Sequence, residues 1–526
     1  GVPNSYMAGS PGTAHLRQVT EAVKEGIWAA GGIPVEFGIL ATCGNVANGA
    51  DEMKYEQVGR DIVAMSIEFV SRIHNFDAIC CVASCDLIIA GCYLAACRLD
   101  IPALVVTGGS MQAGNYCGKT VVEADLDAAR FSGASEAELF EMEESVCPSF
   151  GACPSMGTAN TMQMLGEVLN LVMPGTSTIP ASDNARLRAA RTAGKYMVQL
   201  ARSGKTPKDL ITKDVLENAI MFDMAVAGST NAVLHILAYA YELGIKLTLA
   251  DFEKYAKEIY CINAVIPSGP YTVVDFHYAG GVKQVMKQLA GKIHTDAPTI
   301  YGDTTWGELL DSVKSAPNKV IHSLEDPVAK EPGLKIMRGN ISPAGAIVRP
   351  TAVYEEVKYI KGAAKVYECD QDAYRAIMAG EIVAGDILVI RYEGCKGAPG
   401  MKELMLSIDA LIGLGLDKKV GLITDARFSG FNYGAIVGHV SPEAYDGGVI
   451  ALIENGDEIE MDIAGGTVNL LVSDEILAER RKSWVRPPLK QQKGVLNIYA
   501  QNCRPAEEGG AMQPWALDAD YGYHHE

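Results

Sequence analysis

The sequence predicts an α/β N-terminal domain built on a parallel sheet, followed by a β-barrel-like C-terminal domain. Three observations support this fold class. The chain has 526 residues, more than one hydrophobic core usually organises. Helical and strand patterns alternate from residue 15 to about 110, and short β-type runs dominate beyond about 330. We therefore predict domains at 1–328 and 329–526.

The first elements follow one another in a repeating order. The segment HLRQVTEAVKEGIWAAGG has apolar positions at helical spacing, and IPVEFGILA is typical of a strand. The same alternation then continues through YEQVGRDIVAMSIEFVSRIHNF, DAICCVAS, GCYLAACRLD and IPALVVTGG. Near-continuous apolar strands separated by helices predict a parallel sheet covered on both faces. Ligands of such sheets bind beyond the carboxyl ends of the strands.

The remaining elements divide the chain near residue 325. Residues 120–260 are mostly helical in pattern, and 315–335 is polar and proline-bearing, as in a linker. The β-type runs beyond it are bounded by Gly, Asn and Asp, which indicates a mixed or barrel-like sheet: AAKVYE, GDILVIRYEG, KVGLITDARFSG, GGVIALIENGDEIEMDI and GTVNLLVSD.

Composition excludes several classes of protein. The formal net charge of -19 and the lack of a basic patch argue against a nucleic-acid partner. No segment approaches the ~18 apolar residues of a membrane span, and residues 1–15 lack a secretory signal. The abrupt start at GVPNSY suggests a missing upstream segment. Thirteen cysteines without small-scaffold spacing favour a reducing, cytoplasmic location.

Three cysteines fall where a ligand of the predicted sheet would bind. Cys43 and Cys85 each follow a strand, and Cys153 lies in a glycine-rich loop before a helix, whose N-terminus favours a thiolate. They can converge on a metal centre, although the chain has no CxxC pair. The alternative is that cysteines simply pack in the core, which we expect for Cys80, Cys81, Cys92, Cys97 and Cys261.

Two loops of the second domain carry polar residues with competing interpretations. RYEGCKGAPGMKELM holds Glu393 and Glu403 in a tight loop, or in a solvated turn. ITDARFSGFNYG holds Ser429 at a strand end, either at a site or as an ordinary turn residue. Because there is no GxSxG elbow, a triad hydrolase is poorly supported.

Eight ordered motifs together resemble one family: the dihydroxy-acid dehydratases, iron–sulfur hydro-lyases whose family also holds sugar-acid and 6-phosphogluconate dehydratases. The resemblance runs from about residue 2 to 500. Its motifs are CDLIIAG, ACPSMGTANTM, GSTNAVLHILA, HYAGG, GNISPAGAIV, VIRYEGCKGAPGM, LITDARFSG and VGHVSPEA.

The resemblance implies a set of site residues. Cys85 and Cys153 match cysteines that bind an iron–sulfur cluster, either 2Fe–2S or 4Fe–4S. Asp86 and Glu403 match ligands of a magnesium ion, and Ser429 matches the serine that removes the C2 proton. In such a site the iron assists departure of the C3 hydroxyl and the magnesium grips the carboxylate and C2 hydroxyl.

The chain departs from the family at three further positions of this site. Gly44 replaces an aspartate ligand, Leu87 replaces the lysine that is carbamylated to bind magnesium, and Gly12 replaces a third cluster cysteine. Cys43 is our first candidate for the third thiolate and Cys147 the second. Either Asp51 or Glu52 restores an oxygen ligand, or the magnesium site has been lost.

We therefore expect a hydro-lyase that converts a small 2,3-dihydroxy carboxylate into a 2-oxo acid in branched-chain amino-acid biosynthesis. A sugar-acid dehydratase is the alternative enzyme, because Phe431 replaces a small residue of related enzymes and reshapes the pocket. A non-catalytic binding or scaffold protein is the alternative outside the enzymes, motivated by Gly44 and Leu87. By resemblance, the protein forms a homodimer or homotetramer.

Overall fold

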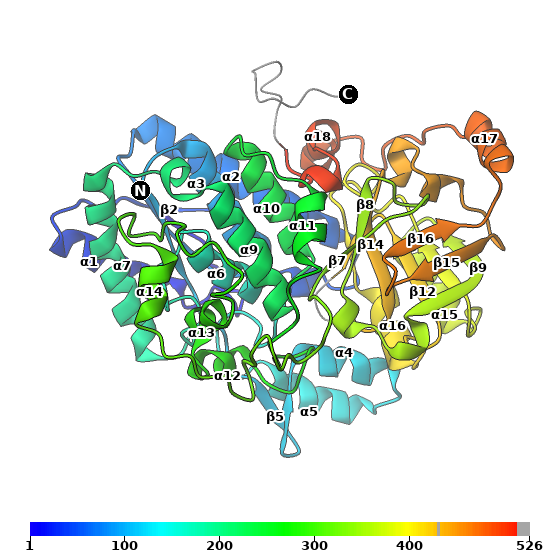
Figure 1. Ribbon diagram of the computed structural model, residues 1–526, viewed down its shortest axis with the longest axis horizontal. Coiled ribbons are helices and arrows are strands. Elements are labelled where there is room, and N and C mark those ends of the chain that lie inside the picture. The colour runs from blue at the N-terminus through cyan, green and yellow to red at the C-terminus, as the bar shows by residue number, and fades with distance from the viewer. Residues whose placement is uncertain (429–431, 513–526) are drawn as a thin grey trace.

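The computed structural model describes residues 1–428 and 432–512, which form two lobes side by side (Figure 1). The blue-to-green lobe is rich in helices, and the yellow-to-orange lobe is built around strands. This arrangement confirms the predicted fold class. Among the described residues, no helix combines the length and the apolar character that crossing a bilayer requires.

The N-terminal lobe is organised by a four-stranded parallel sheet in the order β2-β1-β3-β4. Its strands are β1 (Val2–Asn4), β2 (Glu36–Gly38), β3 (Ile79–Ala83) and β4 (Ala103–Thr107). The sequence patterns predicted β2, β3 and β4. They missed β1, which lies inside the sheet, because its residues VPN do not belong to a longer apolar run, whereas the equally short β2 lies within IPVEFGILA.

Helices cover both faces of this sheet. Side chains of β3 alternate between the two cores: Cys80 and Val82 pack with α1 (Leu16–Ala29) and α7 (Asn184–Ser203). Cys81 and Ala83 pack on the other side with α3 (Asp86–Leu99). These buried cysteines behave as the small apolar residues that the sequence predicted.

Other helices of this lobe pack around the core on the α3 side of the sheet. They include α2 (Tyr55–His74), α6 (Thr158–Val168), α9 (Lys213–Val226) and α10 (Asn231–Glu242). The shorter elements are β5 (Gly114–Tyr116), β6 (Lys119–Val121), α4 (Glu123–Phe131), α5 (Glu136–Val146), α8 (Pro207–Leu210), α11 (Leu249–Tyr255), α12 (Val273–Tyr278), α13 (Gly281–Gln288) and α14 (Trp306–Asp311).

The C-terminal lobe contains an eight-stranded mixed sheet that nearly closes into a barrel. A bridge between Arg338 and Thr467 links the ends of its two edge strands. In sheet order the strands are β16 (Thr467–Leu470), β15 (Glu458–Asp462), β9 (Tyr359–Tyr367), β10 (Ile387–Ile390), β12 (Gly421–Thr424), β14 (Ala435–Ser441), β8 (Gly345–Val348) and β7 (Lys335–Met337).

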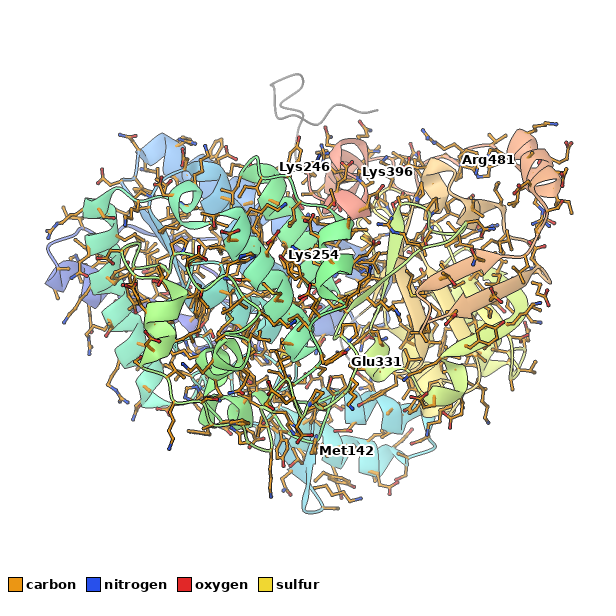
Figure 2. All side chains as sticks on the ribbon, viewed as in Figure 1. Met142, Lys246, Lys254, Glu331, Lys396 and Arg481 are labelled. Atoms are coloured by element: carbon orange, nitrogen blue, oxygen red, sulfur yellow. The ribbon has the colours of Figure 1, made fainter. Side chains whose placement is uncertain are left out.

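Helices and a short strand pair complete this lobe and join it to the first. The helices are α15 (Asp370–Met378), α16 (Leu406–Gly413), α17 (Asp474–Ser483) and α18 (Gly494–Asn502), and the pair is β11 (Glu403–Leu404) with β13 (Arg427–Phe428). Side chains fill the space between the ribbons (Figure 2). Glu331, labelled at the junction in Figure 2, pairs with Lys358 of the second lobe at 2.8 Å.

Candidate active site

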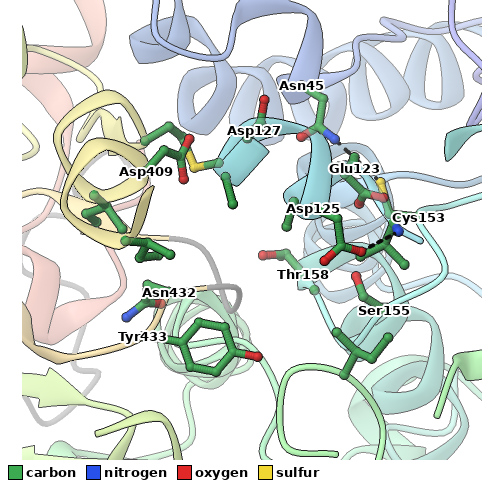
Figure 3. A pocket seen from close by; sticks show the side chains of 18 of the residues that line it. Asn45, Glu123, Asp125, Asp127, Cys153, Ser155, Thr158, Asp409, Asn432 and Tyr433 are labelled. Carbon is green, nitrogen blue, oxygen red and sulfur yellow. Dashed lines mark hydrogen bonds between the residues drawn. The ribbon is translucent and has the colours of Figure 1, made fainter. Parts of the chain in front are cut away.

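A cavity of about 710 Å³ lies between the two lobes. Figure 3 shows it from close by, with Asn45, Cys153 and Glu123 on one side and Asn432 and Tyr433 on the other. Its size falls in the range of ~300–1,000 Å³ that is typical of small-molecule sites. The first lobe contributes residues beyond its strand ends, as open α/β sheets usually do.

Cys85 and Asp86 occupy the turn between β3 and α3. Cys85 has φ 74°, a backbone conformation that residues other than glycine rarely adopt, and Asp86 is the first residue of α3. Strained backbone of this kind concentrates at functional sites. Asp86 also lines the cavity, and its carboxylate accepts no hydrogen bond from the described residues.

The structure brings the three predicted cysteines together. A hydrogen bond from the thiol of Cys85 lowers the pKa of Cys43 to about 7. The same bond, together with burial, raises the pKa of Cys85 well above its ordinary value. Cys153 approaches from the opposite loop, and Asn45 Nδ2 donates to its Sγ at 3.6 Å. The helix N-terminus does not lower the pKa of Cys153, because burial and nearby Glu123 raise it.

A small open space adjoins Cys85 where the family has its third cysteine. A Cβ added to Gly12 would lie 3.4 Å from the Sγ of Cys85. Position 12 therefore borders the thiol of Cys85, which Cys43 also contacts. Cys147, in contrast, is exposed at the end of α5 and does not line the cavity. Burial raises the pKa of Cys147 to about 11.

A second cluster in the cavity consists of carboxylates. Glu56 of α2, Asp86 of α3 and Glu403 of β11 all line it. Burial raises the pKa of Asp86 well above its ordinary value, and the charges of Glu56 and Glu403 raise it further. Burial also raises the pKa of Glu403 to about 7.

Arg427 connects two of these carboxylates across the lobe boundary. Its guanidinium donates to Glu403 Oε2 at 2.9 Å and to Glu56 Oε2 at 3.0 Å, and the arginine is fully buried. Neither Glu56 nor Arg427 was predicted as a site residue. No local motif marks Glu56, whose role depends on the position of α2 relative to the second lobe.

Two of the predicted departures, Leu87 and Gly44, and the predicted replacement ligands Asp51 and Glu52 have different structural settings. Leu87 is buried in α3 and does not line the cavity. Asp51 and Glu52 are exposed in a short 3₁₀ helix and do not line the cavity either. At Gly44, an added Cβ would fall 2.2 Å from Glu56 Oε1. The carboxylate of Glu56 therefore occupies the space into which a side chain at position 44 would extend.

The residues predicted in the two loops of the second lobe differ in where they lie relative to the cavity. Glu393 and Glu403 are both buried, so the solvated-turn interpretation is wrong for both. Glu403 faces the cavity, whereas Glu393 does not line it and instead accepts a hydrogen bond from the backbone N–H of Asp370 at 3.4 Å. Ser429 lies outside the described residues, directly after β13 in the sequence.

The remaining cavity wall combines apolar and acidic surfaces. Met405, Ile408 and Ile412 line it from α16 and its N-terminal flank, and Tyr354 stacks on Tyr433 with ring centroids 6.2 Å apart. Polar lining residues include Lys119, Thr120, Glu123, Asp125, Asp127, Ser155, Thr158, Asn160, Asp409 and Asn432. Within the described chain, Glu123 Oε2, Ser155 Oγ and Asn432 Oδ1 are buried without a hydrogen-bond partner. These atoms are therefore available to water or to a ligand.

The described residues bring three ligand atoms within 4.8 Å of one another at only one place, Asp214, Glu217 and His294, outside this cavity. The three thiols are thus spread more widely than a single ion would require. A cluster with several irons spans a larger distance, so the three thiols fit such a group better than one ion. The carboxylates fit a magnesium ion that takes one or two of them directly and completes its shell with water and substrate.

Comparisons with known proteins agree with this geometry. Residues 1–308 match the family described as dihydroxy-acid/6-phosphogluconate dehydratase N-terminal, and residues 319–510 match its C-terminal counterpart. A dihydroxy-acid dehydratase from Caldanaerobacter subterraneus subsp. tengcongensis is 43% identical over 98% of this chain and 93% of the relative. Those of Ignicoccus hospitalis and Pyrococcus abyssi are 43% and 42% identical over 98% of this chain and 94% of each relative.

Proposed function

The chain belongs to the dihydroxy-acid/6-phosphogluconate dehydratase family, and from this premise we propose that it dehydrates a 2,3-dihydroxy carboxylate to a 2-oxo acid in branched-chain amino-acid biosynthesis. The observation that carries the proposal is the shared cavity, lined by Cys153 and by the carboxylates Glu56, Asp86 and Glu403, with Cys85 directly before Asp86 and in contact with Cys43. Family membership implies an iron–sulfur cluster, and the thiols give it ligands in this chain.

We propose that Cys43, Cys85 and Cys153 bind the cluster. When bound by these thiolates, a cluster would supply a Lewis acid for the C3 hydroxyl. The contact between Cys43 and Cys85 supports the choice of Cys43 over Cys147. Asn45 donates to Cys153 and so orients its sulfur toward the cavity side of the loop.

Asp86 and Glu403 are the proposed magnesium ligands. When bound, magnesium supplies a positive centre for the substrate carboxylate and C2 hydroxyl. Asp86 has a carboxylate open to the cavity, and Glu403 is fixed by Arg427 and by Asn231, whose Nδ2 donates to it at 3.2 Å. Ser429 is the proposed base for the C2 proton. It directly follows β13 in the sequence.

The cavity wall supports a small alkyl-bearing substrate. Met405, Ile408 and Ile412 offer an apolar surface for a branched carbon chain. One observation favours the alternative, a sugar-acid substrate: Asp125, Asp127 and Asp409 also line the cavity and can accept hydrogen bonds from additional hydroxyls. We rank it second because the similar proteins reported above are dihydroxy-acid dehydratases; in Figure 3, Asp125 lies beside Cys153 and Asp409 on the opposite side of the cavity.

The experiment is turnover by anaerobically purified, cluster-reconstituted protein. We expect 2-oxo acid release from 2,3-dihydroxyisovalerate to exceed release from gluconate by at least about tenfold, and a visible absorption band that is lost in Cys85→Ser. Preferential turnover of gluconate would replace the first substrate with the second. Colourless protein after reconstitution with iron and sulfide, and without turnover, would favour the scaffold interpretation.

Two further properties belong to this proposal. All thirteen cysteines are free in the structure, which supports a reducing, cytoplasmic location. A homodimer or homotetramer is proposed from the family resemblance, and size-exclusion chromatography with light scattering would measure it.

A further inference from the structure

The cavity gathers three carboxylates, and Arg427 pairs with two of them. Glu56, Asp86 and Glu403 line one wall, and Arg427 is the cation that contacts Glu56 and Glu403. Both contacts use the Oε2 atoms. Among the described residues no hydrogen bond reaches Oε1 of either glutamate. Concentrated carboxylates with open oxygens are costly unless a cation compensates them.

The position of Glu56 coincides with a space that this chain has vacated. Gly44 has no side chain, and an added Cβ would lie 2.2 Å from Oε1 and 2.8 Å from Cδ of Glu56. Real Cβ atoms do not approach neighbours so closely, so a side chain at 44 and the present conformation of Glu56 exclude each other. The carboxylate of Glu56, on α2, therefore occupies the space that a side chain at position 44 would fill.

We propose that Glu56 supplies a carboxylate oxygen to the divalent cation of this site, in place of a side chain at position 44. The inference rests on the proposed function, because it assigns a ligand to the same reaction site. Arg427 then holds Oε2 and directs Oε1 toward the cation, which makes Arg427 a positioning residue. Glu56, Asp86 and Glu403 all line the cavity, and a hard ion that keeps several waters binds through one or two such carboxylates.

The competing interpretation is that Glu56 only neutralises Arg427. Under that interpretation, replacing Glu56 would change stability but not cation affinity. The two interpretations therefore differ in a binding measurement that requires no turnover.

The experiment uses cluster-reconstituted full-length protein, stripped of divalent cations and titrated with Mn²⁺, which shares the preference of Mg²⁺ for oxygen ligands. Free Mn²⁺ is measured by electron paramagnetic resonance. We expect Glu56→Gln to weaken Mn²⁺ binding by at least about tenfold while the cluster absorption is retained. Glu52→Gln, an exposed carboxylate of the preceding 3₁₀ helix, is the matched control and should leave affinity unchanged.

A relocation variant keeps the test decisive if Glu56→Gln is poorly folded. Gly44→Asp combined with Glu56→Ala removes the carboxylate from α2, frees the space it occupied and returns an acidic side chain to position 44. We expect this double variant to bind Mn²⁺ at least about tenfold more tightly than Glu56→Ala alone. Failure of that restoration, or parental Mn²⁺ affinity in Glu56→Gln, would overturn the inference.

Activity separates this inference from the proposed function. If Mn²⁺ binding depends on Glu56 but neither dihydroxy acids nor sugar acids are converted, the ligand assignment stands and the proposed reaction fails. If dihydroxyisovalerate is converted while Mn²⁺ binding is indifferent to Glu56, the reaction stands and the ligand assignment fails.

Discussion

The sulfur side and the carboxylate side of the cavity are assembled in different ways. Cys43, Cys85 and Cys153 all belong to the N-terminal lobe, beyond strand ends or in the loop before α6. The carboxylates come from both lobes, because Glu403 lies in β11 and Arg427 reaches from β13 to Glu56. The first cluster depends on one sheet edge, whereas the second depends on how the lobes are docked.

Both sides also share one feature. Each lacks a side chain that the family resemblance leads one to expect, at Gly12 on the sulfur side and at Gly44 on the carboxylate side. The two positions differ in what lies against them: Cys85, which Cys43 contacts, borders Gly12, whereas Glu56 fills the space beside Gly44. The comparison teaches that a substituted position is understood only from the side chains that surround it.

The largest expected effect tests the sulfur side. Cys43→Ser should lose most of its iron and most of its turnover, because only two proposed thiolates would remain. Cys147→Ser is the matched control and should keep both, since the thiol in contact with Cys85 is that of Cys43 and Cys147 is exposed. Iron and sulfide content after reconstitution measures the effect. The reverse pattern would assign the third thiolate to Cys147.

A large effect on stability should mark the carboxylate side. Arg427→Met leaves Glu56 and Glu403 buried without their shared cation, which costs about 3–5 kcal/mol for a broken buried ion pair. Denaturant unfolding of the apoprotein measures the loss. A loss below about 1 kcal/mol would mean that the lobes do not depend on this contact. Lys361→Met, which breaks an exposed pair with Glu458, is the control.

A moderate effect on stability should distinguish Glu393 from Glu403, which were predicted in the same loop. Burial raises the pKa of Glu393 from 4.5 to about 7, so its favourable contribution to folding is complete below about pH 4.5 and is lost as pH rises through 7. Relative to the parent, Glu393→Gln should therefore gain about 1–3 kcal/mol of stability between pH 5 and pH 8.

Substitutions of the same two glutamates also distinguish a residue outside the cation site from one within it. Glu393→Gln should bind Mn²⁺ like the parent, whereas Glu403→Gln should bind it more weakly, because only Glu403 lines the cavity. Urea unfolding at the two pH values and the Mn²⁺ titration measure these differences. Glu381→Gln, on the exposed surface, is the control for both. Equal Mn²⁺ affinities for the two variants would contradict the assignment of Glu403.

The smallest effect concerns thiol reactivity in cluster-free protein. The hydrogen bond from Cys85 lowers the pKa of Cys43 to about 7, and burial raises that of Cys147 to about 11. Near pH 7, iodoacetamide should modify Cys43 about tenfold faster than Cys147, although Cys147 is the more exposed. Peptide mass spectrometry over time measures both rates. Faster modification of Cys147 would show that exposure outweighs thiolate content.

Much of the fold could be predicted because its signals are local. The helices α1 and α2 and the strands β3 and β4 have periods and lengths that distinguish them in the sequence. The predicted meeting of Cys43 and Cys85 follows from the rule that parallel strands end at one sheet edge. β1 escaped prediction because it is not surrounded by a longer apolar run in the sequence, and its place in the sheet is fixed by pairing with β2 and β3.

The sequence by itself determined the two-lobe α/β and barrel-like architecture, the family, and the cysteines and carboxylates Cys85, Cys153, Asp86 and Glu403 that its motifs mark. Only the tertiary structure decided which residues lie beside the positions that depart from the family, such as Glu56 beside Gly44. Glu56 lies 371 positions from Arg427 in the chain, and no local pattern couples them. The physical reason is that a ligand site is defined by atoms meeting in space, and that meeting depends on how the two lobes pack.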